Sequence, residues 1–415
     1  MDYITRAAEQ ILLDTAQTFK ALLLTGARQV GKSTLLARMF PEYPQACCDD
    51  PLLRAQATGD PALFLLNHPP PVLLDEVQHA PELFPHIKMA CDRGQEKGRF
   101  LLTGSQPLRL MERVAESLAG RVGIVELCGL SLREIQGCAF AGRFLPTPEY
   151  LAARRPTVRP EADIWRRIHR GGYPEMQDEA LSWNTFYSSY VQTYLERDVS
   201  QIVKVRDKLL FTAFLQAAAA RTGGLLNFDN LADELGMSAA TARAWLSVLE
   251  ASGIVLLLQP FSNSALNRAV KTPKLYFRDT GLACFLTRWD SPETARAGAM
   301  AGALFETFVV NEIVKSYAAA GIDYRFHLRY YRGKDRLRRN GRSLESEIDL
   351  VLCENGVNYP IEIKMTANPR PEMAVAFELL DRPVDARRGP GVIVCLYPEA
   401  LYLERDLLVC PPWWL

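Results

Sequence analysis

The sequence predicts an α/β protein of several domains, with a parallel sheet near its N-terminus. Three observations predict this class. The apolar run "ALLLTG" ends in a glycine-rich turn, and a segment with helical spacing follows it. A second apolar run, residues 72–74, ends in two acidic residues. From residue 298 onward, the pattern is helix, three strands, helix and strand, which is typical of a second α/β unit.

The length and composition limit the possible classes of protein. At about 150 residues per domain, 415 residues suggest two or three domains. Lysine plus arginine and aspartate plus glutamate both total 48, so any surface for nucleic acid must be a local patch. Nine cysteines without a CxxC pair favour free thiols in a reducing compartment, and five scattered histidines argue against a zinc site.

The sequence also argues against a membrane protein. The N-terminus "MDYITRAAEQ" has no apolar signal core. No charge-free apolar run approaches the roughly 18 residues that a membrane span requires. We therefore expect a cytoplasmic protein.

The turn after the first strand matches the phosphate-loop pattern G-x-x-x-x-G-K-[ST] at every position. In such a loop the backbone N–H groups surround the phosphates, Lys32 reaches the β- and γ-phosphates, and Ser33 coordinates Mg²⁺. The sequence therefore predicts that ATP binds with Mg²⁺ at this turn. The residues expected to form this site are Gly26, Ala27, Arg28, Gln29, Val30, Gly31, Lys32, Ser33 and Thr34.

The acidic pair Asp75 and Glu76 follows the second buried strand, where ligands bind in open α/β sheets. We expect Asp75 to hold Mg²⁺ and Glu76 to polarise the attacking water. The next strand, "GRFLLTGSQ", ends at Thr103 and Ser105, either of which is placed to sense the γ-phosphate or to orient water.

Arg121 follows the segment "MERVAESLAG" and is a candidate contact to nucleotide, either in its own subunit or in a neighbouring copy. A neighbouring copy would require a homo-oligomer. The alternative is an ordinary helix end, where a cation is favoured in any case.

The segments "TGARQVGKSTLL", "VLLDEVQ", "LLTGSQ" and "ESLAGR" occur in an order that resembles a family of prokaryotic AAA+ superfamily ATPases. In that family a C-terminal region catalogued only as a domain of unknown function follows the ATPase domain. The resemblance covers essentially all 415 residues. It implies ATP hydrolysis and a phosphate-loop ATPase domain over residues 1–135.

Residues 136–205 are expected to form a lid or helical linker, because residues 136–163 are rich in Pro, Gly, Ala and Arg and have weak periodicity. Residues 206–290 follow the order of a winged helix-turn-helix, with Ser238 as the cap of the second helix. In DNA binding, Arg243 on that helix and a basic wing carrying Arg268, Lys271 and Lys274 would contact DNA. The alternative is a lid or protein-docking module.

Residues 298–415 carry a carboxylate and lysine set. Glu362 and Lys364 lie one residue apart on a predicted strand and therefore share a face, and Asp349 lies on the neighbouring strand. Two carboxylates can bind a divalent cation, Mg²⁺ or Mn²⁺, while Lys364 stabilises developing charge on phosphate. The alternative for this set is a buried salt bridge.

The same set resembles the PD-(D/E)xK nuclease fold, with Glu306 in "GALFE" at the position of that superfamily's first acidic residue. Ile348 stands where the motif has proline. Between the first two strands, residues 329–342 contain seven basic residues and one acid, interleaved with tyrosines. This segment suits a nucleic-acid backbone, with a solvated loop as the alternative.

These observations favour an ATPase that acts on nucleic acid, DNA rather than RNA, through a winged helix and a metal-dependent nuclease-like domain. The competing hypothesis is a nucleotide-gated switch whose nuclease-like fold docks a partner without cleaving it.

Overall fold

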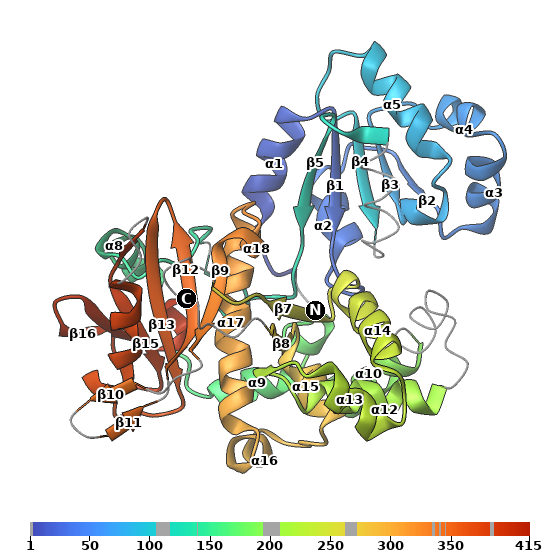
Figure 1. Cartoon of the computed structure of the whole chain (residues 1–415). Coiled ribbons are helices and arrows are strands. Elements are labelled where there is room, and N and C mark those ends of the chain that lie inside the picture. Colours follow the sequence, from blue (N-terminus) through green and yellow to red (C-terminus); the bar gives the residue numbers. More distant parts are fainter. Residues whose placement is uncertain are drawn as a thin grey trace.

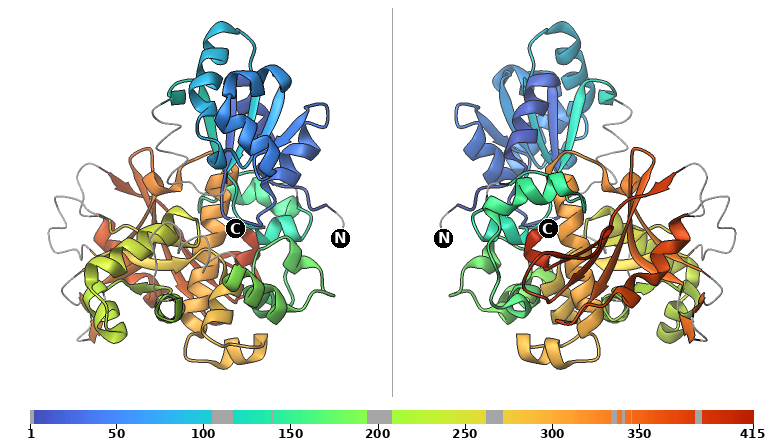
Figure 2. Two further views of the ribbon diagram at one scale, coloured as in Figure 1. Left: turned by 90° about the vertical axis from the view of Figure 1, so that its right-hand side faces the viewer. Right: turned by 90° about the vertical axis from the view of Figure 1, so that its left-hand side faces the viewer.

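The computed structural model describes residues 3–104, 117–138, 140–193, 208–261, 272–333, 337–339, 342–344, 346–381 and 386–415. The N-terminal sheet and its helices form one lobe, and the rest of the chain forms a broader body beneath it (Figures 1 and 2). Within that body the long helix α17 (Ala301–Ala319) lies between the C-terminal sheet and the helices of the middle region.

The N-terminal sheet is entirely parallel, with strand order β2-β3-β4-β1-β5. Its strands are β1 (Ala21–Thr25), β2 (Gln45–Cys47), β3 (Val72–Asp75), β4 (Phe100–Gly104) and β5 (Val122–Glu126). Its helices are α1 (Glu9–Thr18), α2 (Lys32–Met39), α3 (Pro51–Gly59), α4 (Pro61–Asn67) and α5 (Leu83–Arg93). This sheet confirms the predicted phosphate-loop type of N-terminus.

The strands of this sheet are apolar throughout because both faces are covered. Leu22 and Leu24 of β1 belong to one apolar core, and Ala21 and Leu23 belong to another on the opposite face. Because the strands are parallel, the carboxyl ends of β1, β3 and β4 meet at one edge of the sheet. The predicted ligand-binding residues lie at that edge.

Residues 136–163 were expected to form a lid or linker, and the structure contradicts this in part. Phe144 is fully buried, its ring packs edge-on against Tyr150, and its N–H donates to Ser316 Oγ at 3.0 Å. Tyr150 donates to the carbonyl of Trp414 at 2.9 Å, and Arg154 donates to the carbonyl of Trp413 at 3.0 Å. Aromatic side chains among the prolines and glycines thus attach this segment to the C-terminal end of the chain.

Short helices continue the middle region on both sides of the turn at residues 171–174. They are α7 (Leu132–Ile135), α8 (Pro148–Arg154), α9 (Ile164–Arg170) and α10 (Trp183–Tyr190). The aromatic residues Phe186, Tyr187 and Tyr190 of α10 are buried and belong to the core.

Residues 208–286 form a helical unit with a small antiparallel sheet of order β6-β8-β7. Its elements are α12 (Lys208–Ala219), β6 (Gly224–Leu225), α13 (Phe228–Leu235), α14 (Ala239–Ala251), β7 (Val255–Leu258), β8 (Lys274–Phe277) and α15 (Thr280–Leu286). The helix α13 ends at Gly236, which is left-handed, and Ser238 caps α14 through Thr241 N, as predicted. Arg268 and Lys271 of the predicted wing lie outside the described residues.

The C-terminal unit is a mixed sheet of order β16-β17-β15-β13-β12-β9, with β14 beside β13. Its strands are β9 (Leu328–Arg332), β12 (Glu347–Glu354), β13 (Val357–Lys364), β14 (Arg387–Arg388), β15 (Gly391–Cys395), β16 (Leu401–Glu404) and β17 (Leu407–Cys410). A separate hairpin pairs β10 (Leu337–Arg339) with β11 (Arg342–Leu344). The remaining helices are α16 (Pro292–Ala297), α18 (Tyr324–His327) and the 3-10 helix η6 (Pro371–Asp381).

The C-terminal prediction was wrong in one detail. The first of the three predicted strands is "YRFHLRYYR", residues 324–332. Residues 324–327 instead form α18, because Asp323 caps a helical turn by accepting from Arg325 N, and β9 begins at Leu328. The third predicted strand, which carries Glu362 and Lys364, forms β13.

Two further expectations concern the whole chain. All nine cysteines are free thiols, as predicted. Among the described residues, none of the helices has the length and apolar character needed to cross a membrane.

Replacing Phe144 by Ala tests whether residues 136–163 contribute to the core. We expect the free energy of unfolding to fall by about 3–5 kcal/mol, because a fully buried aromatic ring leaves a cavity. Leu66→Ala is the control, since Leu66 is 75% exposed and its loss should cost less than about 0.5 kcal/mol. Urea denaturation monitored by tryptophan fluorescence measures both, and equal effects would contradict the packing described.

Candidate functional site

The phosphate loop joins β1 to α2 in a conformation that its glycines permit. Gly26 has φ +142°, and a Cβ at this position would lie 2.2 Å from the carbonyl oxygen of Leu127. Gly31 has φ +90° and precedes α2, and no described side chain caps the first turn of that helix. Its N–H groups and the positive end of its dipole therefore suit a phosphate group.

Lys32 is buried at the base of this loop. Its ammonium donates to the carbonyls of Gly26 at 3.1 Å and Ala27 at 2.9 Å. Burial lowers the pKa of Lys32 to about 8, while Glu76 and Asp75 act in the opposite direction. A phosphate oxygen is a stronger acceptor than these carbonyls, and its negative charge favours the ammonium form that burial disfavours.

Asp75 connects the loop to the next two strands. Its Oδ1 accepts from Ser33 Oγ at 2.6 Å and also from the hydroxyl of Thr103, which is fully buried at the end of β4. Ser33 and Asp75 therefore present a hydroxyl and a carboxylate side by side, and such oxygen ligands suit Mg²⁺. These are the residues that the sequence predicted, brought together from three segments.

Glu76 adjoins this network. Its backbone is left-handed, with φ +53°, and its N–H donates to Thr103 Oγ1 at 3.1 Å. The side chain accepts from Gln78. Thr103 thus joins Asp75 to the backbone of Glu76, a role that the sequence only partly anticipated.

Arg121 does not lie near the phosphate loop of its own chain. It precedes β5 at the opposite end of the sheet, where its carbonyl accepts from Ala21 N, and its side chain pairs with Asp92. The prediction of a contact to nucleotide within the same subunit is therefore wrong. Arg121 precedes β5 and therefore lies at the amino ends of the parallel strands. The phosphate loop, Asp75 and Thr103 lie at their carboxyl ends. A contact to another copy stays a prediction, and Ser105 lies outside the described residues.

Three segments surround the phosphate loop. Arg6 donates to the carbonyls of Val30 at 2.9 Å and Cys128 at 2.7 Å, and pairs with Glu134 at 3.0 Å. The turn at residues 171–174 reaches Gly31, where a Cβ would lie 3.9 Å from Pro174.

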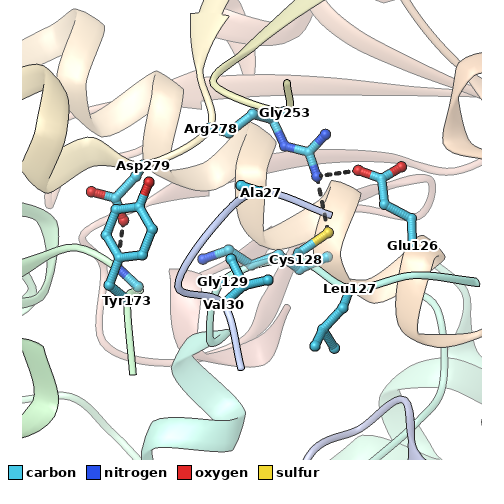
Figure 3. Close-up of a pocket in the computed structure, with 12 residues that line it drawn as sticks. Ala27, Val30, Glu126, Leu127, Cys128, Gly129, Tyr173, Gly253, Arg278 and Asp279 are labelled. Carbon is cyan, nitrogen blue, oxygen red and sulfur yellow. Dashed lines mark hydrogen bonds and ion pairs between the residues drawn. The ribbon is translucent and has the colours of Figure 1, made fainter. Parts of the chain in front are cut away.

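The third segment is the turn at Gly253, where a Cβ would lie 3.4 Å from Ala27 N. Figure 3 shows Ala27 and Val30 facing Arg278, Asp279 and Tyr173 across a small cavity. The loop is therefore in contact with parts of the chain far from it in sequence.

Arg278 and Asp279, which follow β8, form the far wall of this cavity. Arg278 pairs with Glu126 at 3.1 Å and donates to Cys128 Sγ and to the hydroxyl of Tyr324. Asp279 accepts from Gly172 N at 2.7 Å, and its carboxyl group caps α15. Burial raises the pKa of Asp279, although these N–H donors oppose the shift.

A second group of charges lies on the C-terminal sheet, and we call it the carboxylate cluster. Its members are Glu306, Glu347, Asp349 and Glu362. They come from α17, β12 and β13. Together with Lys364, the three strand residues line a cavity of about 300 Å³. The structure thus brings together all four residues that the sequence placed in the nuclease-like set.

Lys364 pairs with Glu362 at 2.5 Å and with Asp349 at 3.6 Å. Asp349 also accepts from Ile363 N at 2.9 Å. Burial and Asp349 raise the pKa of Glu362 well above its usual value, and the same two causes raise that of Glu306 to about 7.

Lys274 of β8 also enters the carboxylate cluster, and only 3% of its side chain is exposed. Burial acts to lower the pKa of Lys274, but Tyr276 and Glu306 raise it well above its usual value. The prediction that Lys274 contacts DNA as part of a basic wing is therefore wrong. The run of basic residues before the strand predicts one exposed tip that includes Lys274, whereas β8 is buried from its first residue.

The cluster does not fit a divalent cation in this arrangement. Within the part of the chain that the structure describes, no group of three His, Cys, Asp or Glu side chains is placed to hold a metal ion. Two ammonium groups already lie among the carboxylates. The expectation that Asp349 and Glu362 hold Mg²⁺ or Mn²⁺ is thus not met, and the salt-bridge alternative describes what is observed.

The sequence did not predict the site residues whose partners lie far away along the chain. Arg6, Glu347, Arg278 and Asp279 belong to no short motif, and Lys274 was assigned to a different surface. A partial signal was available in "KLYFRDTGL", where charged residues flank an otherwise apolar strand.

Comparison with known proteins agrees with this geometry. A family model described as AAA domain matches residues 18–136, and two domains of unknown function, DUF8612 and DUF4143, match residues 161–293 and 301–414. With the phosphate loop and Asp75 in place, the chain is a AAA-type P-loop ATPase.

The chain belongs to the family of two mycobacterial proteins. These are the uncharacterized proteins Rv2008c of Mycobacterium tuberculosis and Mb2031c of Mycobacterium bovis. Each is 30% identical over 368 residues, covering 87% of this chain and 74% of the relative. Among solved structures, the Walker-type ATPase PABY2304 of Pyrococcus abyssi is 15% identical, covers 69% of this chain and 96% of its own, and has a TM-score of 0.40.

Replacing Thr103 by Val tests the network around Asp75. The substitution keeps the shape but removes the hydroxyl that joins Asp75 to Glu76 N. We expect ATP turnover to fall about 100-fold, as when a group that positions a reacting water is lost, with little change in ATP affinity. A coupled turnover assay and fluorescent-nucleotide titration measure the two. Arg121→Ala, at low protein concentration, should leave turnover unchanged, and a similar loss there would contradict the placement of the site.

Proposed function

We propose that the chain is an ATP-hydrolysing switch that acts on nucleic acid, and that its C-terminal domain docks a partner rather than cleaving it. The observation that carries the first part is the network of Ser33, Asp75 and Thr103 beside the phosphate loop. A protein that only binds nucleotide does not require the water-polarising acid Glu76 next to that network.

In this mechanism each residue has a defined task. Ser33 and Asp75 would hold the Mg²⁺ that accompanies ATP, and the ion neutralises charge on the phosphates. Lys32 exchanges its bonds to the loop carbonyls for bonds to phosphate oxygens. Glu76 accepts a proton from water, and Thr103 fixes the orientation of the backbone that carries Glu76.

The contacts around the loop support a switch. Arg6, Pro174 and Gly253 touch the loop or lie close to it, and each belongs to a different segment. A loop that rearranges around a γ-phosphate therefore acts directly on the turn after α14 and on the turn that Asp279 holds. The first of these turns belongs to the helical unit that is proposed to bind nucleic acid, and Asp279 of that unit holds the second.

The order of α13, α14 and the sheet β6-β8-β7 supports a winged-helix interpretation. Arg243 on α14 is exposed, and its guanidinium group lies over the ring of Phe228 of α13 at 5.0 Å. A helix of this kind fits the major groove of DNA better than the narrow groove of RNA. The basic sequence of residues 329–342 provides a second positive segment.

Metal-dependent cleavage by a PD-(D/E)xK-like site is the competing function. The convergence of Asp349, Glu362 and Lys364 on adjacent positions of β12 and β13 favours it. The lysine among the carboxylates and the lack of fit to a metal ion favour docking without cleavage. We therefore derive no cleavage step.

Two variants test ATP hydrolysis. Lys32→Ala should abolish ATP binding, because it removes the charge that faces the phosphates. Glu76→Gln should bind ATP as wild type does but turn it over about 100-fold more slowly. Isothermal titration and phosphate release measure these on the full chain. ATP turnover by Glu76→Gln at the wild-type rate would contradict the role of Glu76.

Fluorescence anisotropy with labelled single- and double-stranded DNA and RNA tests the second part. We expect binding whose affinity changes between ADP and a non-hydrolysable ATP analogue. Arg243→Ala should weaken binding to all sequences alike and lower the salt slope by about 1. Arg296→Ala, an exposed arginine of α16, is the matched control. Cleavage products that disappear in Asp349→Ala would show that the nuclease hypothesis is correct instead.

A further inference from the structure

The carboxylate cluster contains a lysine that comes from outside its own sheet. Lys274 is the first residue of β8, which pairs with β7 and β6 rather than with any strand of the C-terminal sheet. Glu306 is on α17, and Glu347 and Asp349 are on β12. Two units of the chain therefore meet at this one side chain.

The ammonium group of Lys274 is directed at carboxylates on several sides. It lies 3.0 Å from Glu306 Oε1, 2.7 Å from Glu347 Oε1 and 3.8 Å from Asp349 Oδ1. Glu306 and Glu347 are within hydrogen-bond distance of the ammonium group, and Asp349 is a longer-range ion-pair partner. Tyr276, two residues further along β8, donates to the same oxygen of Glu306 at 2.6 Å.

Burial makes a cation at this position necessary. Glu306, Glu347 and Asp349 have side chains that are 17%, 17% and 9% exposed, and buried carboxylates without a counter-charge are strongly destabilising. Either a divalent ion or an ammonium group can supply the charge. The side chains are arranged around the ammonium group, and the described residues offer no metal-binding set.

Glu362 lies at the edge of this arrangement. Its Oε1 pairs with Lys364, whereas Oε2 is buried without a hydrogen-bond partner among the described residues. The cluster therefore keeps a spare carboxylate oxygen that can act as a ligand if charge is removed nearby. Loss of Lys274 would leave it beside Glu306, Glu347 and Asp349, with only Lys364 and Arg332 as counter-charges in the described ranges.

We propose that Lys274 is the resident cation of the carboxylate cluster and takes the place of a divalent ion there. The cluster of this chain is thus an internal salt-bridge site that joins β8 to the C-terminal sheet, not a metal centre. The proposal deepens the function proposed above, because it explains why that domain docks without cleaving. The statement about Lys274 rests on its own contacts and does not require nucleic-acid binding.

Removing the charge of Lys274 should convert the carboxylate cluster into a site that binds a divalent cation. Lys274→Met keeps the length of the side chain and its apolar stem but removes the charge. Without Lys274, four carboxylates face only two cations in the part of the chain that is described, Lys364 and Arg332. The excess negative charge attracts a hard divalent cation, for which oxygen ligands are suited. We expect the variant to bind one Mn²⁺ per chain at least about tenfold more tightly than wild type, since one lost positive charge at this range corresponds to 1.4 kcal/mol or more.

The experiment is Mn²⁺ titration of the nucleotide-free full chain, followed by electron paramagnetic resonance. Lys315→Met is the matched control: Lys315 is also largely buried and pairs with a single glutamate, Glu312, at 2.7 Å. The Lys315→Met variant should bind Mn²⁺ with the same affinity as wild type. Equal Mn²⁺ affinity in Lys274→Met and wild type would overturn the proposal.

Glu306→Gln keeps the proposal testable if Lys274→Met does not fold. If Glu306 serves Lys274, the wild-type Mn²⁺ affinity should not change in this variant. If Glu306 is a metal ligand, wild type should bind Mn²⁺ tightly and Glu306→Gln should weaken that binding, which would overturn the proposal. Neither outcome depends on the anisotropy assay, so failure of nucleic-acid binding is recognised separately.

Discussion

The structure depends on β8, a buried strand with charged residues at both ends. At its start, Lys274 supplies the positive charge that the carboxylate cluster needs. Just after its end, Arg278 and Asp279 satisfy acceptors and donors in the wall of the phosphate-loop cavity. Lys274 and Arg278 are four residues apart, about 13 Å along an extended chain. Because each end is costly to leave unpaired, β8 cannot shift at one site without affecting the other.

This arrangement gives a physical route between ATP and the C-terminal domain. The phosphate loop touches the turn at Gly253, which precedes β7, and β7 pairs along its whole length with β8. Packed interfaces switch between discrete arrangements rather than deform gradually, and we propose that small movements at the loop are passed on as changes of ion-pair partner. The proposed coupling therefore requires no additional element beyond the strands already described.

Much of the ATPase site could be predicted because its parts obey local rules. The phosphate loop is contiguous, and the parallel sheet brings Asp75 and Thr103 to the same edge as Ser33. The order of helices and strands in the C-terminal unit was also largely predictable. Arg121 was misplaced because a residue before a strand lies at the wrong end of the sheet. The prediction for Lys274 was wrong because its carboxylate partners lie 32 to 75 residues away in the sequence. Sequence patterns do not predict which side chains meet over such separations.

The most direct test of the account is an anomalous difference map from crystals of the full chain grown with Mn²⁺ and a non-hydrolysable ATP analogue. The account predicts a manganese peak between the nucleotide and the side chains of Ser33 and Asp75, with no peak in the carboxylate cluster. A peak bounded by Asp349 and Glu362, with Lys274 displaced, would contradict it. Such a result would make the C-terminal domain a metal centre and favour the nuclease hypothesis.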